Sequence, residues 1–450
     1  MAIDAALRSN AKKGVLKNVF SLWIVQVSNY VFPFLTVPIV SRIIGPDKLG
    51  VINWSAAFMA YFTILINFGF DLSATRAIAA QRDNLAERNR IFNQVVSAKI
   101  LLFGVSIVLF IGSLFLFPQL RAEKQVAIYS FLLCFAWVIT PNWLYQGMQE
   151  LSRIAVFNLV TKIIFTVVIL IVVRQKSDYI WQPLAISIAQ IAVGVYSFLF
   201  AVKRYKITLG LSKLQPVLDL LWQERIIFFS MVVVNLYTTT NIVLLGFMQN
   251  NVQVGYYTAG WRLIMIIQQM IAIPLGQALF PFVGSAFAED REKGLIVIKQ
   301  LIPIVTALTG FASILLFLFG EIGIKIIYGD KFLPSVAVFR VLAFVPMIIT
   351  WSNLLGIQTM LNLKMDKVFF RITAAGAVLC ILLNLILVKQ FGYMGTAWCW
   401  LLSEFFITAT MYVVLRRKGI NVIDLRFFSP TYFKKYLDPM ISKIKQKINK

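Results

Sequence analysis

About twelve long apolar segments take up nearly all of this 450-residue chain, and no stretch between them is long enough to form a soluble domain. A helix that spans a bilayer needs roughly 20 mostly apolar residues. The sequence therefore predicts an all-α integral membrane protein whose function lies between its helices. The expected transmembrane segments are 19–40, 51–71, 96–117, 126–148, 155–173, 180–202, 226–248, 254–283, 301–320, 335–361, 369–388 and 394–415.

Composition supports the same class of protein. Hydrophobic residues make up 59% of the chain, charged residues only 14%, and the mean hydropathy is +0.80. A water-soluble core of this size is not so apolar. The formal net charge of +24 is spread over loops and the C-terminal tail, a distribution that favours anionic membrane lipids over nucleic acid as partners.

The distribution of Lys and Arg predicts the topology, because these residues are retained on the cytoplasmic side of short loops. If both termini are cytoplasmic, about three quarters of the Lys and Arg fall on that side. The expected parts are a basic N-terminal segment (1–18), an N-lobe (19–202), a cytoplasmic linker (203–225), a C-lobe (226–415) and a basic amphipathic tail on the membrane surface (416–450).

A weak internal repeat relates the two halves of the chain. Asn29 precedes Gly50 by about one helix length, and Asn235 precedes Gly255 by a similar distance. Both glycines are expected at the start of the next helix, on the outer side. Because each half has an even number of spans, the two six-helix lobes should be related by a pseudo-twofold axis along the membrane normal.

Polar side chains inside the spans are the best indicators of a site, because lipid offers them no partners. The first, second, seventh and eighth segments carry stripes of Asn, Gln and Thr and are expected to line one central cavity. The alternative for each amide is a hydrogen bond that only holds helices together. The candidate substrate-binding residues are Arg262, Arg42, Arg340, Lys162, Asn29, Asn67, Asn235 and Gln269.

Arg262 is the strongest of these candidates. It lies seven residues after Gly255, roughly 10 Å inside a helix. An isolated charge at that depth must face a partner or water, and a guanidinium can bind phosphate with two parallel hydrogen bonds. For Arg42 and Arg340, which lie near helix ends, extension of the side chain toward water is an equal alternative.

Glu404 and Asp71 are the candidates for ion coupling. The alternative for Glu404 is a counter-ion of a buried cation. The chain has no histidine, and its three cysteines lie inside predicted spans, so neither a metal site nor a disulfide framework is expected. No cofactor is expected apart from a coupling proton or sodium ion.

Four stretches of the sequence carry a resemblance to a known family: residues 35–50 (LTVPIVSRIIGPDKLG), 67–76 (NFGFDLSATR), 254–263 (VGYYTAGWRL) and 391–404. They resemble polysaccharide transporters of the O-antigen flippase type, within the multidrug/oligosaccharidyl-lipid/polysaccharide exporter superfamily. The resemblance implies two six-helix lobes around a cleft in a bacterial inner membrane. It also implies transport, without enzymatic chemistry, of an oligosaccharide repeat unit linked to undecaprenyl pyrophosphate, from the cytoplasmic to the periplasmic leaflet. A polysaccharide polymerase and a chain-length regulator would be partners.

Two other functions stay open at this point. A multidrug or small-molecule antiporter of the same fold would need an acidic, aromatic cavity for cationic drugs, whereas Arg262 is a cation and the first segment lacks the internal carboxylate of many such exporters. A membrane polymerase or ligase acting on the same lipid carrier is the enzymatic alternative. Against this alternative, the sequence has no histidine and no large predicted outer loop with which to build a catalytic site.

Overall fold

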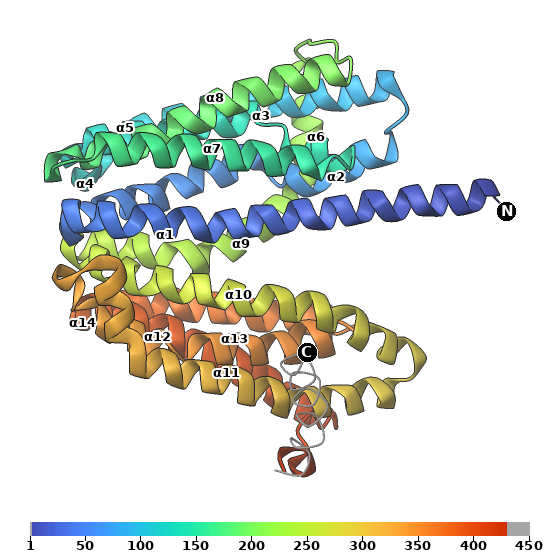
Figure 1. The fold of residues 1–450 in the computed structure, drawn as a ribbon, viewed down its shortest axis with the longest axis vertical. Helices are drawn as coiled ribbons and strands as arrows, with labels where there is room; N and C mark the ends of the chain where they lie inside the picture. The colour runs from blue at the N-terminus through green and yellow to red at the C-terminus, as the bar shows by residue number, and fades with distance from the viewer. Residues whose placement is uncertain (1, 430–450) are drawn as a thin grey trace, which may run out of the picture. The chain divides into compact units, whose positions relative to one another are not determined.

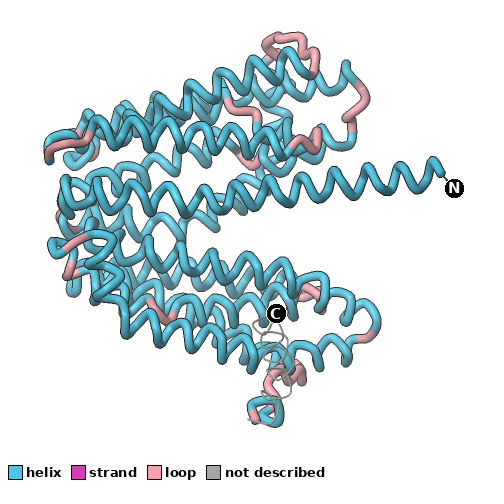
Figure 2. Tube along the Cα trace, in the orientation of Figure 1, coloured by secondary structure: helices cyan, strands magenta, loops and turns pink. Residues whose placement is uncertain are grey.

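The computed structural model describes the backbone of residues 2–429, and side chains from Val31 onward except those of 234, 236–238, 272–278 and 280. Within this part the chain is helical almost throughout and contains no strand (Figure 2). Eight of the described helices are long and apolar enough to cross a membrane. The predicted all-α membrane class is therefore confirmed, and the expected tail helix after residue 429 lies outside the described residues.

The α-helices differ widely in length, and the short ones mark places where a membrane segment is interrupted. Their bounds are α1 Ala2–Asn67, α2 Phe70–Ala80, α3 Leu85–Leu116, α4 Pro118–Ala122, α5 Lys124–Ile139, α6 Asn142–Gly147, α7 Leu151–Val172, α8 Trp181–Arg204, α9 Leu214–Met248, α10 Asn251–Glu289, α11 Arg291–Tyr328, α12 Ser335–Leu342, α13 Val345–Asn353 and α14 Asp366–Arg417.

Two of the long helices each contain two of the predicted segments. The backbone of α1 leaves helical geometry at Gly45 (φ 76°), and that of α14 does so at Gly392 (φ 55°). A positive φ is readily adopted by glycine, so each break needs only one residue. Each of these helices therefore crosses the predicted membrane region twice, which reconciles eight long helices with a larger number of spans.

Two other predicted segments are interrupted rather than continuous. Segment 126–148 divides at Pro141 into α5 and the short helix α6. Segment 335–361 divides into α12, α13 and a π-helical turn, Leu354–Met360. Segment length and overall hydropathy did not indicate these interruptions, although polar residues such as Asn142 and Asn353 stand at them.

The chain forms two compact units: Met1–Tyr256 with Ile326–Phe332, and Tyr257–Lys325 with Leu333–Lys450. In the first unit α5 packs on α8, α1 packs on α7 and α9, and α2 packs on α6 (Figure 1). In the second unit α14 packs on α12 and α13. These units are defined by which helices pack together. The lobe boundaries inferred from the sequence, 19–202 and 226–415, stay a prediction.

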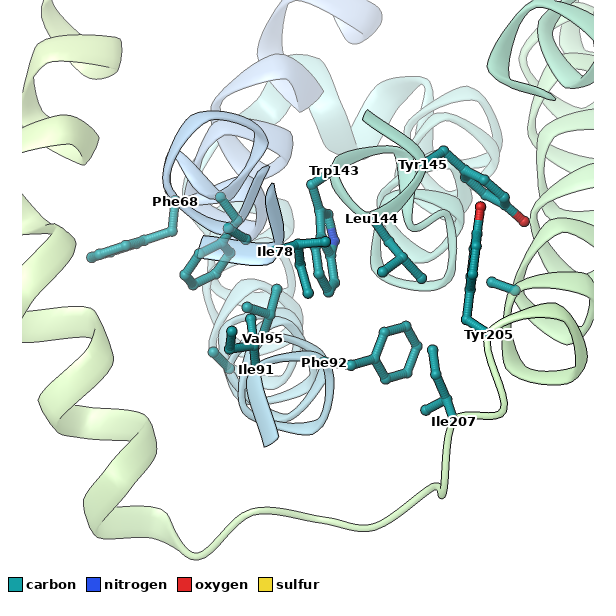
Figure 3. Packing of buried hydrophobic residues seen from close by; sticks show 14 of the residues in the cluster. Phe68, Ile78, Ile91, Phe92, Val95, Trp143, Leu144, Tyr145, Tyr205 and Ile207 are labelled. Carbon is teal, nitrogen blue, oxygen red and sulfur yellow. The ribbon is translucent and has the colours of Figure 1, made fainter. Parts of the chain in front are cut away.

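The core of the first unit surrounds the short helix α6 (Figure 3). Trp143 is 1% exposed and packs against Phe92 of α3, with ring centroids 5.7 Å apart. The hydroxyl of the buried Tyr145 donates to the backbone oxygen of Ser197 on α8, at 2.6 Å. Aromatic packing and one satisfied hydroxyl thus fix α6 between its neighbours.

Other helices present their apolar side chains outward. On α3, Phe115 and Leu116 are each 74% exposed, and α7 and α11 carry further exposed Ile, Val, Leu and Phe. Exposed apolar surface on this scale is unfavourable in water and typical of a face that contacts lipid.

Glycines pack the start of α10 directly onto the second half of α1. A Cβ on Gly50 would lie 1.8 Å from the carbonyl oxygen of Asn251, and a Cβ on Gly255 would lie 1.9 Å from that of Pro46. The contact is reciprocal: each glycine meets the residue four positions before the other. The two helices begin at Pro46 and Asn251, so each repeat glycine lies about one turn inside its helix. The sequence predicted both glycines at the helix starts, about one turn earlier.

The contact of α1 with α10 continues along α9, and we call this line of contacts of α1 with α9 and α10 the seam. The indole of Trp54 donates to the backbone oxygen of Val243 at 3.1 Å and leaves no space for a side chain on Gly246. Further along, the hydroxyls of Tyr61 and Thr240 are 2.7 Å apart. Helices that the sequence assigns to different lobes are therefore joined here, within the first unit.

Ion pairs hold the turn at which this seam begins. Lys48 pairs with Glu123 at 3.1 Å, and Asp47 pairs with Lys176 at 2.8 Å. Each pair is partly exposed, so its net contribution to stability is small, about 0–1 kcal/mol. They nevertheless connect the turn to the loops before α5 and α8, and so fix the start of the second half of α1.

The glycine contact generates a prediction about stability. Gly50→Ala must displace the carbonyl of Asn251, and overpacking of this kind costs about 1–3 kcal/mol. The purified variant is therefore expected to melt at a lower temperature in detergent than the wild type. Gly104→Ala on α3 is the matched control, because a Cβ there meets nothing within 4 Å. Equal melting temperatures for the two variants would contradict the contact.

Candidate functional site

The first cluster of polar groups lies where α1 gives way to α2. Helix α1 ends at Asn67, and Phe68 and Gly69 both have positive φ, 47° and 86°. A Cβ on Gly69 would lie 2.5 Å from the side chain of Ile227, so glycine is needed there for space as well as for conformation. The break leaves the last carbonyls of α1 without helical partners and places Asp71 in the first turn of α2.

Lys99 of α3 reaches into this break. Its side chain is 1% exposed, and its Nζ donates to Asn67 Oδ1 and to the backbone oxygen of Trp137, each at 3.1 Å. Asp71 lies close enough to attract its charge. We call Lys99, Asn67, Asp71 and the Trp137 carbonyl the lysine site. It joins two residues that the sequence had put forward for different roles, Asn67 for substrate and Asp71 for ions.

Lys99 is not among the residues predicted from the sequence. It falls near the start of the predicted segment 96–117 and so resembled a cation at a membrane boundary. In the structure α3 begins at Leu85, which places Lys99 about 21 Å along the helix. The signal that could have found it is a capping residue: Asn84 accepts a hydrogen bond from the Glu87 backbone, so the helix begins well before its apolar part.

A second cluster lies in the second unit, on α10 and α14. The rings of Trp261 and Trp400 have centroids 6.5 Å apart, and the indole of Trp400 donates to Glu404 Oε1 at 3.3 Å. Next to this pair, Gly260 brings α10 close to α12, since a Cβ on it would lie 3.0 Å from the backbone oxygen of Ser335. We call Trp261, Trp400 and Glu404 the tryptophan site.

Arg262 follows Trp261 directly and is partly buried. Among the residues that the structure describes, it makes no hydrogen bond and no ion pair. A guanidinium carries five N–H donors, and leaving them unpaired inside a membrane segment is costly unless water or a ligand reaches them. Arg262 therefore has the donors that an anionic group requires.

Glu404 is 6% exposed, as deeply buried as the apolar residues around it. Within the described part of the chain its carboxylate is bonded to Trp400 and is paired with no cation. The neighbouring Thr408 donates to the backbone oxygens of Glu404 and Ile348, and so fixes the helix without reaching the carboxylate. A buried carboxylate with one neutral donor is a group for which binding a proton or a cation is favourable.

Arg42 and Arg340 both lie near helix ends. The guanidinium of the exposed Arg42 donates to the backbone oxygen of Ile326, in the last turn of α11, at 2.5 Å. That of Arg340 lies 3.7 Å from Glu321. An arginine on the last carbonyls of a helix is stabilising by itself. Both residues thus have structural partners, and their binding roles stay predictions.

The other candidates are dispersed. Lys162 is partly buried on α7, and Gln269 is exposed on α10. The Asn235 amide donates to the backbone oxygen of Met231, on its own helix, at 2.9 Å. Asn29 is in α1, and its side chain is outside the described part. The cavity that these residues were predicted to line together therefore stays a prediction.

Comparison with known proteins identifies the family. Residues 15–287 match the model of a family described as "Polysaccharide biosynthesis protein". This match covers more than half of the chain, and the chain belongs to that family. The resemblance seen in the four sequence stretches is confirmed.

Two relatives extend the similarity over almost the whole chain. A protein of Escherichia coli (strain K12) named "Putative O-antigen transporter" is 29% identical over 415 residues, covering 91% of this chain and 99% of the relative. A protein of Shigella dysenteriae with the same name is 25% identical and covers 88% of this chain and 98% of the relative.

Two solved structures share the fold. The chain is similar to the lipid II flippase MurJ in an inward closed conformation, with a TM-score of 0.70 at 13% identity, over 95% of this chain and 92% of MurJ. It is also similar to an inward-facing multidrug resistance MATE family transporter of the MOP superfamily, with a TM-score of 0.66 at 14% identity, over 89% of this chain and 98% of that one. The protein thus has the two-lobe helical fold of these membrane transporters.

Proposed function

We propose that this protein is a flippase for oligosaccharide repeat units linked to undecaprenyl pyrophosphate, such as O-antigen units. It carries them from the cytoplasmic to the periplasmic leaflet of a bacterial inner membrane, and both of its termini are cytoplasmic. Membership of a polysaccharide biosynthesis family and similarity to named O-antigen transporters support this proposal. The observation that carries it is the partly buried guanidinium of Arg262, on a predicted membrane segment, which has no partner among the described residues.

The chemistry of the cargo fits such a group. A pyrophosphate-linked sugar is anionic and hydrophilic, so it needs a hydrated path with cationic donors, while its lipid tail can stay in the bilayer. Arginine suits this role better than lysine because its planar fork holds two phosphate oxygens at once. In the proposed cycle, Arg262 binds the pyrophosphate while the path is open to the cytoplasm and releases it after the helices have rearranged.

Alternating access would require the seam between α1 and the helices α9 and α10 to open. The seam combines glycine contacts and a few polar bonds with aromatic packing, in which Trp54 and Phe58 of α1 contact Phe247 of α9. Opening it therefore requires these rings to separate as well. We further propose that the seam closes the periplasmic side and that its opening releases the cargo outward.

The multidrug antiporter is the second candidate, since the MATE transporters have the same fold. The buried Glu404 is the one feature that favours it, because a carboxylate suits a cationic drug. Arg262 on the neighbouring helix, which has no partner in the part of the chain that the structure describes, favours an anionic cargo instead. No observation favours the polymerase or ligase, and the relatives are named as transporters.

Depletion of the protein in a cell that makes the polysaccharide tests the function. The expected result is that lipid-linked repeat units accumulate in the cytoplasmic leaflet, where they are hidden from reagents added to the periplasm. Restoring the protein should return them to the outer leaflet. Unchanged accessibility of the repeat units in depleted cells would contradict the proposal.

Arg262 provides a sharper test at the level of one residue. Arg262→Ala is expected to abolish surface-polysaccharide assembly at normal protein levels, and Arg262→Lys to retain part of it, because lysine keeps the charge but not the paired donors. Assembly is measured by gel analysis of the polysaccharide. Arg340→Ala is the control, because Arg340 already has a carboxylate partner, Glu321, and should tolerate the change better. Normal assembly with Arg262→Ala would refute the role.

Glu404 is the proposed residue for ion coupling, with a proton or sodium ion as the coupled ion. Glu404→Gln keeps the acceptor for the Trp400 indole but removes the charge. We expect proton or sodium flux in proteoliposomes to disappear while the protein stays folded. If coupled flux persists in this variant, Glu404 is only part of the packing around Trp400.

A further inference from the structure

Lys99 is the most deeply buried charged side chain in the described part of the chain, and it lies far from any helix end of its own. Its environment is nevertheless rich in oxygen. The ammonium contacts the Asn67 amide oxygen and the Trp137 carbonyl, and Asp71 contributes a negative charge nearby.

Two helix ends converge on this point. Asn67 is the last residue of α1, and Trp137 lies in the last turn of α5. The carbonyl of Ala136, one residue earlier, is bonded by the Thr140 backbone and hydroxyl, whereas that of Trp137 points to Lys99. Helix C-termini carry partial negative charge, and interrupted helices in transporters bind small cations through such carbonyls.

We propose that the break between α1 and α2 is a cation-binding cage and that the ammonium of Lys99 is its permanent occupant. The ligands are the Asn67 amide oxygen and the Trp137 carbonyl, and the Asp71 carboxylate adds negative charge nearby without bonding the ammonium directly. Carbonyl oxygens at an interrupted helix are groups of the kind that bind a small monovalent cation. The chain thus supplies, from α3, the charge that sodium or potassium would otherwise supply. This inference does not depend on what the protein transports.

A consequence concerns ion coupling. While Lys99 occupies the cage, a free sodium ion is excluded from it by both space and charge. A coupling ion must then bind elsewhere in the molecule. The tethered ammonium also ties α3 to the break, so α1, α2, α3 and α5 stay together as one body when other helices move.

Removing the ammonium should create a vacant cation site. Lys99→Ala is expected to melt at a lower temperature than the wild type in choline chloride, whose cation is too large for the cage. Sodium, lithium or methylammonium chloride at the same ionic strength should restore part of the loss, and the recovery should saturate with concentration as a single binding site does. The wild type should show no difference between choline and sodium.

Three further variants control this result. Lys99→Met fills the space without a charge, so it should lose stability with no recovery by any cation. The double variant Lys99→Ala/Asn67→Ala should lose the recovery, because a cage ligand is gone. Lys162→Ala removes another lysine from a membrane helix and should show no difference between choline and sodium. A destabilised Lys99→Ala that no small cation restores, or one as stable as the wild type, would overturn the proposal.

Variants of Asn67 test the cation cage if Lys99→Ala does not accumulate in a folded form. A carboxylate 3.1 Å from a fixed ammonium forms a stronger bond than an amide. Asn67→Asp is therefore expected to melt at or above the wild-type temperature, and the similarly sized Asn67→Leu below it. A comparable fall for both variants would show that no ammonium occupies the cage.

Discussion

The absence of water in the bilayer interior is the constraint on which this structure depends. Every backbone N–H and C=O in the membrane must find a partner within the protein, and an unbroken helix provides one for each group. Wherever a helix is interrupted, the freed groups need side chains. The interruption at Asn67 brings in Lys99, and the turn at Gly45 is surrounded by ion pairs. The chemistry of this protein therefore gathers at its helix breaks.

Three of the charges on predicted membrane segments, those of Lys99, Glu404 and Arg262, have different numbers of partners among the described residues, and this difference distinguishes structural from functional roles. Lys99 has an amide, a carbonyl and a nearby carboxylate, and so holds helices together. Glu404 has a single neutral donor. Arg262 has no partner in the described part of the chain. A charge that is fully paired is expected to be structural, whereas one that lacks partners is available for a ligand or an ion.

Much of the fold could be predicted from the sequence, because hydropathy and segment length directly reflect the thickness of a bilayer. The family was predictable from four short stretches. The interruptions at Pro141 and at Leu354–Met360 could not be predicted in this way, because hydropathy does not register a break inside an apolar segment. Lys99 was missed for the related reason that apolar residues begin well after its helix does. The repeat glycines Gly50 and Gly255 were recognised, but their mutual contact depends on tertiary packing.

The proposed activity is the movement of a lipid-linked oligosaccharide between leaflets. Reconstitution tests it most directly: the purified protein is placed in liposomes whose lipid-linked oligosaccharide is confined to the inner leaflet, and the fraction that reaches a membrane-impermeant lectin is followed over time. We expect this fraction to rise with the wild-type protein and to stay low in protein-free liposomes. An equally low fraction with folded, correctly inserted protein, across imposed proton and sodium gradients, would contradict it.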